Sequence, residues 1–309
     1  MPGAFAHITA VNKMILSDYF VREFDSDARR ILTMNQPFME LGSLAPDFPY
    51  LVFGNKPQAL WADIMHSSGV NSCLIEMIQY VKSLQGQSFA KAYAWLSGYL
   101  AHIVADITIH PVIERTVGHY KENKNLHRVC EMHQDAHIWH RMGLGDIGNK
   151  ERVSRTLECC SGRDSPLDPI LIDIWSLGLL SIDMPNKVEM PNIRLWFESF
   201  QKVINVVEDN YQLFPFSRHV AAFVGLKYPD IKDIQPQFIN NLPTPAGRMP
   251  YDELFDLCVD EVGHYLNLLW NSVVYNGDLD WIKQWNLDIG EDENGVMTIW
   301  DKYSTRQRA

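Results

Sequence analysis

The sequence has few cysteines and no leader-like start. Its five cysteines are odd in number and form neither a disulfide framework nor a CxxC metal knuckle. At the amino end, Asn12 and Lys13 interrupt the apolar residues, and no basic segment precedes them, which argues against a secretory signal. These absences predict a protein of the reducing cytoplasm.

Long uncharged apolar runs and an excess of basic residues are also missing. The run at 170–182 is short for a membrane span and contains Asp173, so a soluble protein without a transmembrane segment is predicted. With 27 Lys and Arg against 38 Asp and Glu, the net charge is −11. This balance disfavours nonspecific binding to nucleic acid or anionic lipid, but it is compatible with an anionic substrate held by metal ions.

Apolar residues recur with helical spacing along most of the chain. Three segments place apolar side chains three and four positions apart: 88–110, 195–214 and 251–274. Strict alternation is hard to find in any long window. We therefore predict an all-α fold, with a single helical domain over residues 1–275 and a C-terminal tail over 276–309. A short hairpin is expected in this tail, around Glu293, Asn294 and Gly295.

A stripe of histidine and aspartate occupies one of these helices. His102, Asp106 and His110 stand four residues apart, and four residues advance a helix by about 6 Å and about 40°. The three side chains therefore share a face that otherwise has the character of a core. An ionised carboxylate buried there needs compensation, and metal ions are the usual source. Pro111, directly after the stripe, predicts a break or kink in the helix.

The next segment, LHRVCEMHQDAHIWH, contains two competing tracks. His127, Glu131 and Asp135 form one stripe at spacing four, while His133 and His137 form another, roughly 120° away around the helix. Either track could supply imidazole or carboxylate ligands to zinc. Residue spacing alone leaves this choice open.

Two upstream residues extend the set. Asp47 lies in a Gly- and Pro-rich turn, LGSLAPDFPY, and His66 precedes a small-residue loop. Each is weak evidence when taken alone, because an aspartate after proline usually forms a turn or caps a helix. Together with His7 and the two stripes, however, they follow a recognisable order.

This order resembles the zinc-dependent phospholipase C and S1/P1 nuclease superfamily, over roughly residues 2–140. The resemblance implies an all-helical protein that holds three zinc ions in a cleft and hydrolyses phosphate esters. It also implies the ligands of each ion: Asp47, His66, His102 and Asp106 for the first, His110, His127 and Glu131 for the second, and Pro2, His7 and Asp106 for the third. By the same resemblance His133 and His137 either lie behind the ligands or on the surface, and Asp135 is an orienting residue.

The third site depends on the start of the chain. In the family, the mature N-terminal residue binds through its amino nitrogen and carbonyl oxygen, and a histidine five positions later binds beside it. Removal of the initiator methionine would make Pro2 the terminus, five positions before His7. This differs from secreted relatives, which often begin at Trp after a leader is removed.

The resemblance implies a zinc-dependent phosphoester hydrolase of the phospholipase C type, in which a metal-bound hydroxide attacks phosphorus and Asp47 orients or deprotonates the water. A phospholipid or a small phosphorylated molecule is the expected substrate, and an apolar rim at 48–53 would suit a lipid. The alternatives are a nuclease or nucleotidase, a small-metabolite phosphatase, and a metal-binding helical protein without turnover. Iron or manganese would also suit these ligands.

Overall fold

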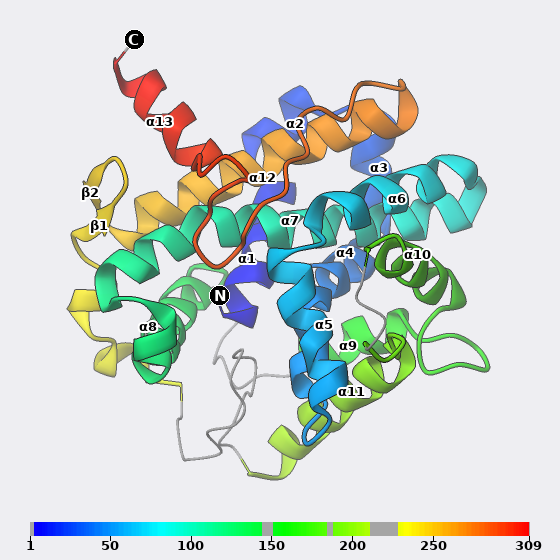
Figure 1. Cartoon of the computed structure of the whole chain (residues 1–309), viewed down its shortest axis with the longest axis horizontal. Coiled ribbons are helices and arrows are strands. Elements are labelled where there is room, and N and C mark those ends of the chain that lie inside the picture. The colour runs from blue at the N-terminus through cyan, green and yellow to red at the C-terminus, as the bar shows by residue number, and fades with distance from the viewer. Residues whose placement is uncertain (1–2, 144–150, 184–187, 211–227, 309) are drawn as a thin grey trace.

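The computed structural model describes residues 3–143, 151–183, 188–210 and 228–308. Within these ranges most of the chain folds into helices, and Figure 1 shows their arrangement. The α-helices are α1 (Ala4–Ile15), α2 (Asp18–Glu23), α3 (Ser26–Met34), α4 (Gln36–Gly42), α5 (Lys56–Ser67), α6 (Val70–Ser83), α7 (Gly86–Val117), α8 (Tyr120–Arg141), α9 (Glu151–Cys159), α10 (Pro169–Leu180), α11 (Ile193–Asn210), α12 (Tyr251–Val274) and α13 (Thr298–Arg308). Three short 3-10 helices are η1 (Ala45–Leu51), η2 (Ile231–Asp233) and η3 (Pro236–Phe238). The prediction of an all-α fold is confirmed.

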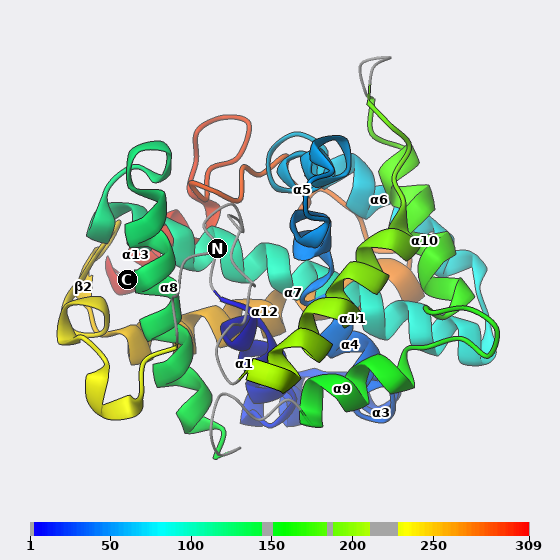
Figure 2. The same ribbon diagram turned by 90° about the horizontal axis from the view of Figure 1, so that it is seen from below.

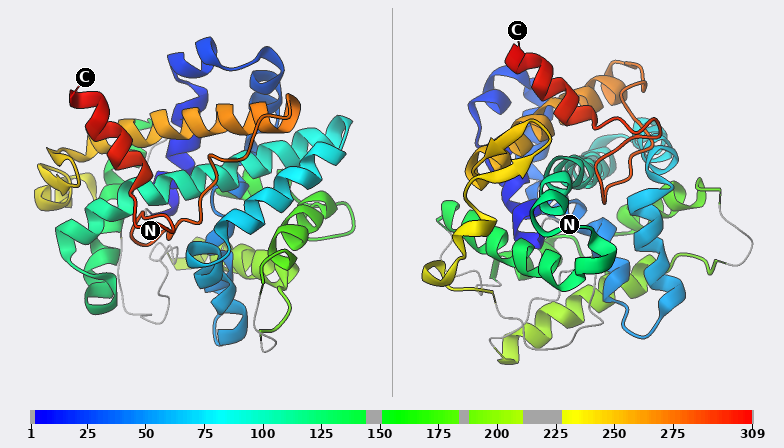
Figure 3. Two further views of the ribbon diagram at one scale, coloured as in Figure 1. Left: turned by 45° about the horizontal axis from the view of Figure 1, so that its top comes forward. Right: turned by 60° about the vertical axis from the view of Figure 1, so that its left-hand side comes forward.

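The long helix α7 is the axis of the core. All of its residues from Ala92 to Ile113 are buried, and α4 and α12 pack against it. Figure 3 shows α12 running beside α7. By length and composition alone α7 would be apolar enough to cross a membrane, but its most apolar window lies wholly inside the protein. It is therefore the core helix that its apolar spacing predicts.

The predicted break at Pro111 is absent, because α7 continues to Val117 and ends before Gly118, whose φ is 84°. Pro111 cannot donate a hydrogen bond to the carbonyl of Ile107, four residues earlier. The C-terminal segment packs at this point. A Cβ on Gly290 would lie only 2.8 Å from the Ile107 oxygen and 2.5 Å from Pro111 Cγ. Tertiary packing therefore covers the position at which an isolated helix would be weakest.

Helices α4 and α7 cross with their backbones in close contact. A Cβ on Gly98 would lie 1.9 Å from the Met39 carbonyl oxygen, and a Cβ on Gly42 would lie 2.0 Å from the Trp95 carbonyl oxygen. Only glycine allows such an approach. The crossing places Ser43, the residue after α4, next to the middle of α7.

Short helices in the chain begin at side-chain caps. Four capping side chains accept backbone N–H groups at the starts of α2, α3, α5 and α10, and these are Ser17, Asp25, Asn55 and Asp168. Such residues satisfy donors that have no acceptor inside the helix. They divide the chain into several short helices around α7 instead of a few long ones.

The described chain contains one small sheet, which the sequence analysis did not predict. Strand β1 (Leu242–Thr244) pairs antiparallel with β2 (Gly247–Met249), with Leu242 opposite Met249. The predicted helix at 251–274 has the same bounds as α12, whereas the last residues of the predicted helix at 195–214 lie outside the described residues.

The C-terminal segment passes across α7 (Figure 1). It contains an isolated antiparallel bridge between Asn286 and Glu291, and a turn follows in which Asp292 N donates to the Val296 carbonyl. Trp300 then donates from Nε1 to the Thr108 carbonyl at 3.1 Å. The hairpin at 293–295 and the boundary near residue 275 remain predictions.

Candidate metal centre

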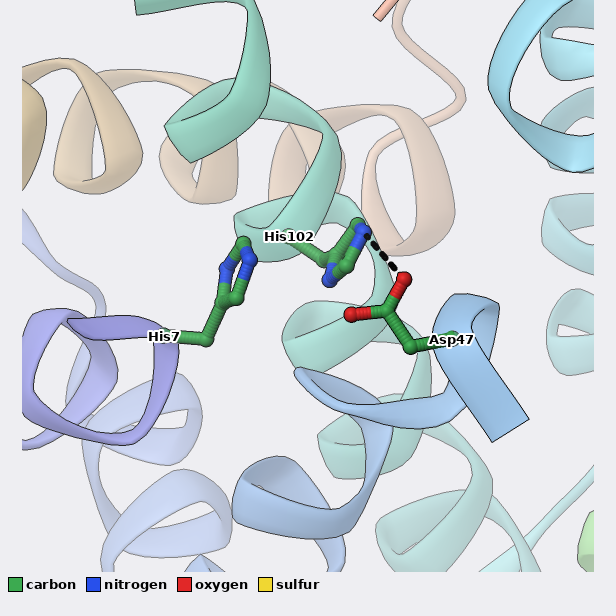
Figure 4. Close-up of side chains that lie close together, drawn as sticks. All are labelled: His7, Asp47 and His102. Atoms are coloured by element: carbon green, nitrogen blue, oxygen red, sulfur yellow. Dashed lines mark ion pairs between the residues drawn. The ribbon is translucent and has the colours of Figure 1, made fainter. Parts of the chain in front are cut away.

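Five side chains from four elements converge beside the middle of α7. His102 and Asp106 come from α7, His7 from α1, Asp47 from η1 and His66 from α5. Each is at most 4% exposed. Figure 4 shows three of them, with His7 and Asp47 on opposite sides of His102. The fold therefore brings together residues that lie far apart in the sequence.

Asp106 lies at the centre of this group. Its Oδ2 is 3.4 Å from His102 Nε2 and 3.6 Å from His66 Nε2. Its Oδ1 is 3.4 Å from His7 Nε2 and 4.0 Å from His110 Nε2. Each carboxylate oxygen therefore faces a different pair of imidazoles.

Asp47 closes the opposite side. Its Oδ1 is 3.3 Å from His66 Nε2 and 4.0 Å from His102 Nε2, the second contact being the dashed line in Figure 4. Two compact sets of ligand atoms result, one from His7, Asp47 and His102 and one from His66, His102 and Asp106, with all atoms of a set within 4.8 Å of one another. Either set could hold a metal ion.

Four histidines each direct one ring nitrogen at a backbone carbonyl. The pairs are His66 Nδ1 with Ala62 at 2.6 Å, His102 Nδ1 with Ser43 at 2.9 Å, His127 Nε2 with Gly118 at 2.6 Å, and His110 Nδ1 with Leu287. A carbonyl only accepts, so the ring nitrogen in each pair donates, and the other ring nitrogen is the one left to face a metal. Metal-binding histidines are oriented in this way.

The site contains buried polar atoms that a metal would satisfy. Within the described ranges, both ring nitrogens of His7, both oxygens of Asp106 and Oδ1 of Asp47 lack a well-formed hydrogen bond. Buried polar atoms are seldom left in this condition. Imidazole nitrogen and carboxylate oxygen are ordinary zinc ligands, so the residues present fit the ion that the resemblance implies.

The charges in the site favour a cation. Burial alone would raise the pKa of Asp106, but His102 and His110 hold it well below its usual range. Burial would lower the pKa of His102, but Asp106 and Asp47 outweigh it and raise that pKa. Burial and the neighbouring His102 lower the pKa of His7 to about 4. At neutral pH the aspartates are therefore ionised, and His7 is a neutral imidazole.

The predicted second set is less compact. His127 and Glu131 are buried one turn apart on α8 and interact electrostatically. In the part of the chain that the structure describes, neither belongs to the two compact sets, and nor does His110. Pro2 lies outside the described residues. The ligand roles of these four residues remain predictions, as do those of the five converging residues.

The structure gives other partners to the competing histidines. His133 Nδ1 accepts a hydrogen bond from Gln235 N at 3.1 Å, and His137 pairs with Asp252 at 3.1 Å. Sequence reasoning missed Glu114, whose Oε1 lies 3.9 Å from His127 Nε2. Glu114 lies four residues after His110 and so continues the stripe of His102, Asp106 and His110 on α7. That spacing could have identified it.

The prediction that residues 48–53 form an exposed apolar rim is wrong. Phe48, Leu51 and Val52 are buried, and Phe48 stacks on Phe200 of α11 at 4.4 Å. Only Phe53 is substantially exposed, at 47%. These apolar side chains therefore anchor η1, and with it Asp47, against the neighbouring helices.

Comparisons with known proteins agree with this geometry. A family model described as zinc dependent phospholipase C matches residues 6–168, more than half of the chain. No curated protein and no solved structure is significantly similar to it. The matched range contains every described residue of the cluster. The chain therefore belongs to the zinc-dependent phospholipase C family.

Proposed function

We propose that this protein is a zinc-dependent hydrolase of phosphate esters, with Asp47, His66, His102 and Asp106 as its central ligands. The observation that carries the proposal is the convergence of two ionised, buried carboxylates with imidazole nitrogens inside the family match. When bound, zinc activates water as a nucleophile and neutralises charge on phosphate oxygens.

The chain's own residues prepare this chemistry. Ser43 and Ala62 hold the rings of His102 and His66 through their carbonyls, so both Nε2 atoms face the site before any ion binds. Burial would raise the pKa of Asp47, but His102 and His66 keep it lowered. Asp47 is then an ionised carboxylate at neutral pH, suited to orient a water molecule or accept its proton.

Elemental analysis followed by a substrate panel tests the proposal. The panel contains phosphatidylcholine, nucleotide monoesters and single-stranded nucleic acid. We expect bound zinc and hydrolysis of phosphatidylcholine or of a small phosphate ester, because the acidic chain disfavours nucleic acid. Tightly bound zinc with no hydrolysis of any member would instead favour a metal-binding protein without turnover, and iron without hydrolysis would reject the zinc assignment.

His127→Ala and Glu131→Gln test the second set of ligands. Each variant is expected to lower the zinc content by about one ion per chain and to slow hydrolysis, while the ions bound around Asp106 remain. The physical reason is that α8 supplies these ligands separately from the cluster on α7. Zinc per chain is measured after dialysis, with His137→Ala as the control from the same helix. Unchanged zinc content in both variants would remove α8 from the metal centre.

An N-terminal tag tests Pro2. A mature chain that begins at Pro2 presents a free amine, and mass spectrometry of the untagged protein should find this start. Residues added before Pro2 are expected to weaken one metal site and slow hydrolysis, because they convert the amine into an amide. The same tag placed after Ala309 serves as the control. Full activity and three ions in the N-terminally tagged protein would show that Pro2 is an ordinary first residue.

A further inference from the structure

We propose that Asp135 is a positioning residue of the metal centre, which holds the first turn of α1 so that His7 reaches Asp106. This inference rests on the proposed function, because it assigns His7 to the metal site. Asp135 lies on α8 and is fully buried. The residues that it holds, Phe5 and Ala6, lie about 130 positions earlier in the sequence.

Asp135 caps the start of α1 from another helix. Its Oδ1 accepts a hydrogen bond from Ala6 N at 2.8 Å, and its Oδ2 accepts one from Phe5 N at 3.3 Å. These N–H groups belong to the first turn, where a helix has few acceptors of its own, although Ala6 N also donates to the Gly3 carbonyl at 3.0 Å. The local N-cap residue, Gly3, has no side chain to serve them. The distant carboxyl group accepts the hydrogen bonds that a local capping side chain normally would.

Residues around Asp135 pack against it and against the start of α1. Tyr228 Oη donates to Asp135 Oδ2 at 3.0 Å. The ring of Phe5 packs edge-on against Trp139 and Tyr228, with centroids 4.6 and 5.5 Å apart. A Cβ on Gly3 would lie 1.9 Å from Asp135 Oδ2, so the backbone of Gly3 lies directly against the carboxylate. Figure 2 shows α1 beside α8, which carries Asp135.

His7 needs such an anchor more than the other histidines do. The rings of His66, His102 and His110 are each oriented by a backbone carbonyl. Among the described residues, no backbone carbonyl orients His7 in this way, and its Nε2 only approaches Asp106 Oδ1, at 3.4 Å. Its ring is placed by stacking on His102 at 4.1 Å and by the path of α1.

The end turns of a helix fray unless contacts hold them, and His7 lies in the first turn of α1 (Ala4–Ile15). Because Ala6 immediately precedes His7, the hydrogen bonds from Asp135 act on the peptide next to the ligand. Loss of this anchor would leave the His7 imidazole intact but no longer fixed 3.4 Å from Asp106.

Asp135→Ala is the first test, with zinc affinity measured by competition against a chelator. We expect one zinc site to weaken about 10- to 100-fold, as is typical when a residue that orients a ligand is lost, with helical circular dichroism retained. Gly3→Ala supplies a second variant, which displaces the carboxylate without removing it and should weaken the same site. It also keeps the test decisive if Asp135→Ala does not fold.

Glu261→Gln is the matched control. Glu261 is an equally buried carboxylate, but it holds α13 through Lys302 at 3.2 Å and Arg306 at 3.1 Å. This variant should lose stability and keep wild-type zinc affinity. If Asp135→Ala or Gly3→Ala folds and binds zinc as tightly as wild type at every site, the inference is overturned. A wild-type protein that binds zinc but hydrolyses no phosphoester would defeat the proposed function alone, since the effect on zinc affinity would still be measurable.

Discussion

Asp106→Asn is expected to abolish both zinc binding at the cluster and phosphoester hydrolysis. The two oxygens of Asp106 face separate pairs of imidazoles, so one substitution disturbs both groups of ligands. Asparagine has nearly the same shape but replaces one oxygen by an amide that only donates. It also removes a buried negative charge that attracts the ions. Loss of several kcal/mol of transition-state stabilisation corresponds to at least about a 1,000-fold fall in rate.

Zinc per chain and the rate on the best phosphoester substrate are the measurements for this variant. Asp252→Asn is a suitable control, because Asp252 is a partly exposed carboxylate that pairs with His137 and Arg141. It should leave both quantities near wild type. His102→Ala should resemble Asp106→Asn. Wild-type zinc content and activity in either cluster variant would refute the site.

Gly98→Ala is expected to destabilise the fold by at least about 3 kcal/mol. The added Cβ would lie 1.9 Å from the Met39 carbonyl oxygen and 2.7 Å from Ser43 N. Both atoms belong to backbone, so the clash can be relieved only by separating α4 from α7. That separation would also move the Ser43 carbonyl, which orients His102. Zinc affinity should therefore fall together with stability.

Whether Gly98→Ala lowers or raises the free energy of unfolding shows whether α4 and α7 cross closely. In a helix without tertiary contacts, alanine is more favourable than glycine by about 1 kcal/mol, so a stabilised variant would mean that the helices do not cross closely. Urea unfolding provides the free energy. Gly178→Ala is the control, because its Cβ would meet side chains and not backbone: Met77 Cε at 2.6 Å, Met77 Cγ at 2.8 Å and Cys73 Sγ at 2.9 Å. We expect a clearly smaller loss there.

Much of the candidate site could be predicted because helical spacing is a local property. His102 and Asp106 were identified from a repeat of four residues, and the structure places both on the buried face of α7. Asp47 and His66 have no such local pattern. They were predicted only through the order of motifs that the family shares, since convergence of η1 and α5 on α7 leaves no trace in their own neighbourhoods.

Other features could not be read from spacing at all. The carbonyls that orient His102 and His110 come from Ser43 and Leu287, and a main-chain acceptor has no residue-type signature. The apolar residues after Asp47 were interpreted as a surface rim, although most are core. An apolar run looks the same whether a helix or a membrane covers it, so only the packing of α11 distinguished the two.

The sequence by itself determined the helical class, the family and the residue types able to bind zinc, because periodicity and motif order lie along the chain. The tertiary structure decided which atoms meet. It directed the two oxygens of Asp106 at different histidines. It also brought the Leu287 carbonyl to His110 and the Asp135 carboxylate to the first turn of α1. It also linked the start of α1 to α8, since the position of His7 depends on the carboxylate of Asp135, more than a hundred positions away. These contacts join distant segments, and their geometry depends on packing that no local pattern encodes.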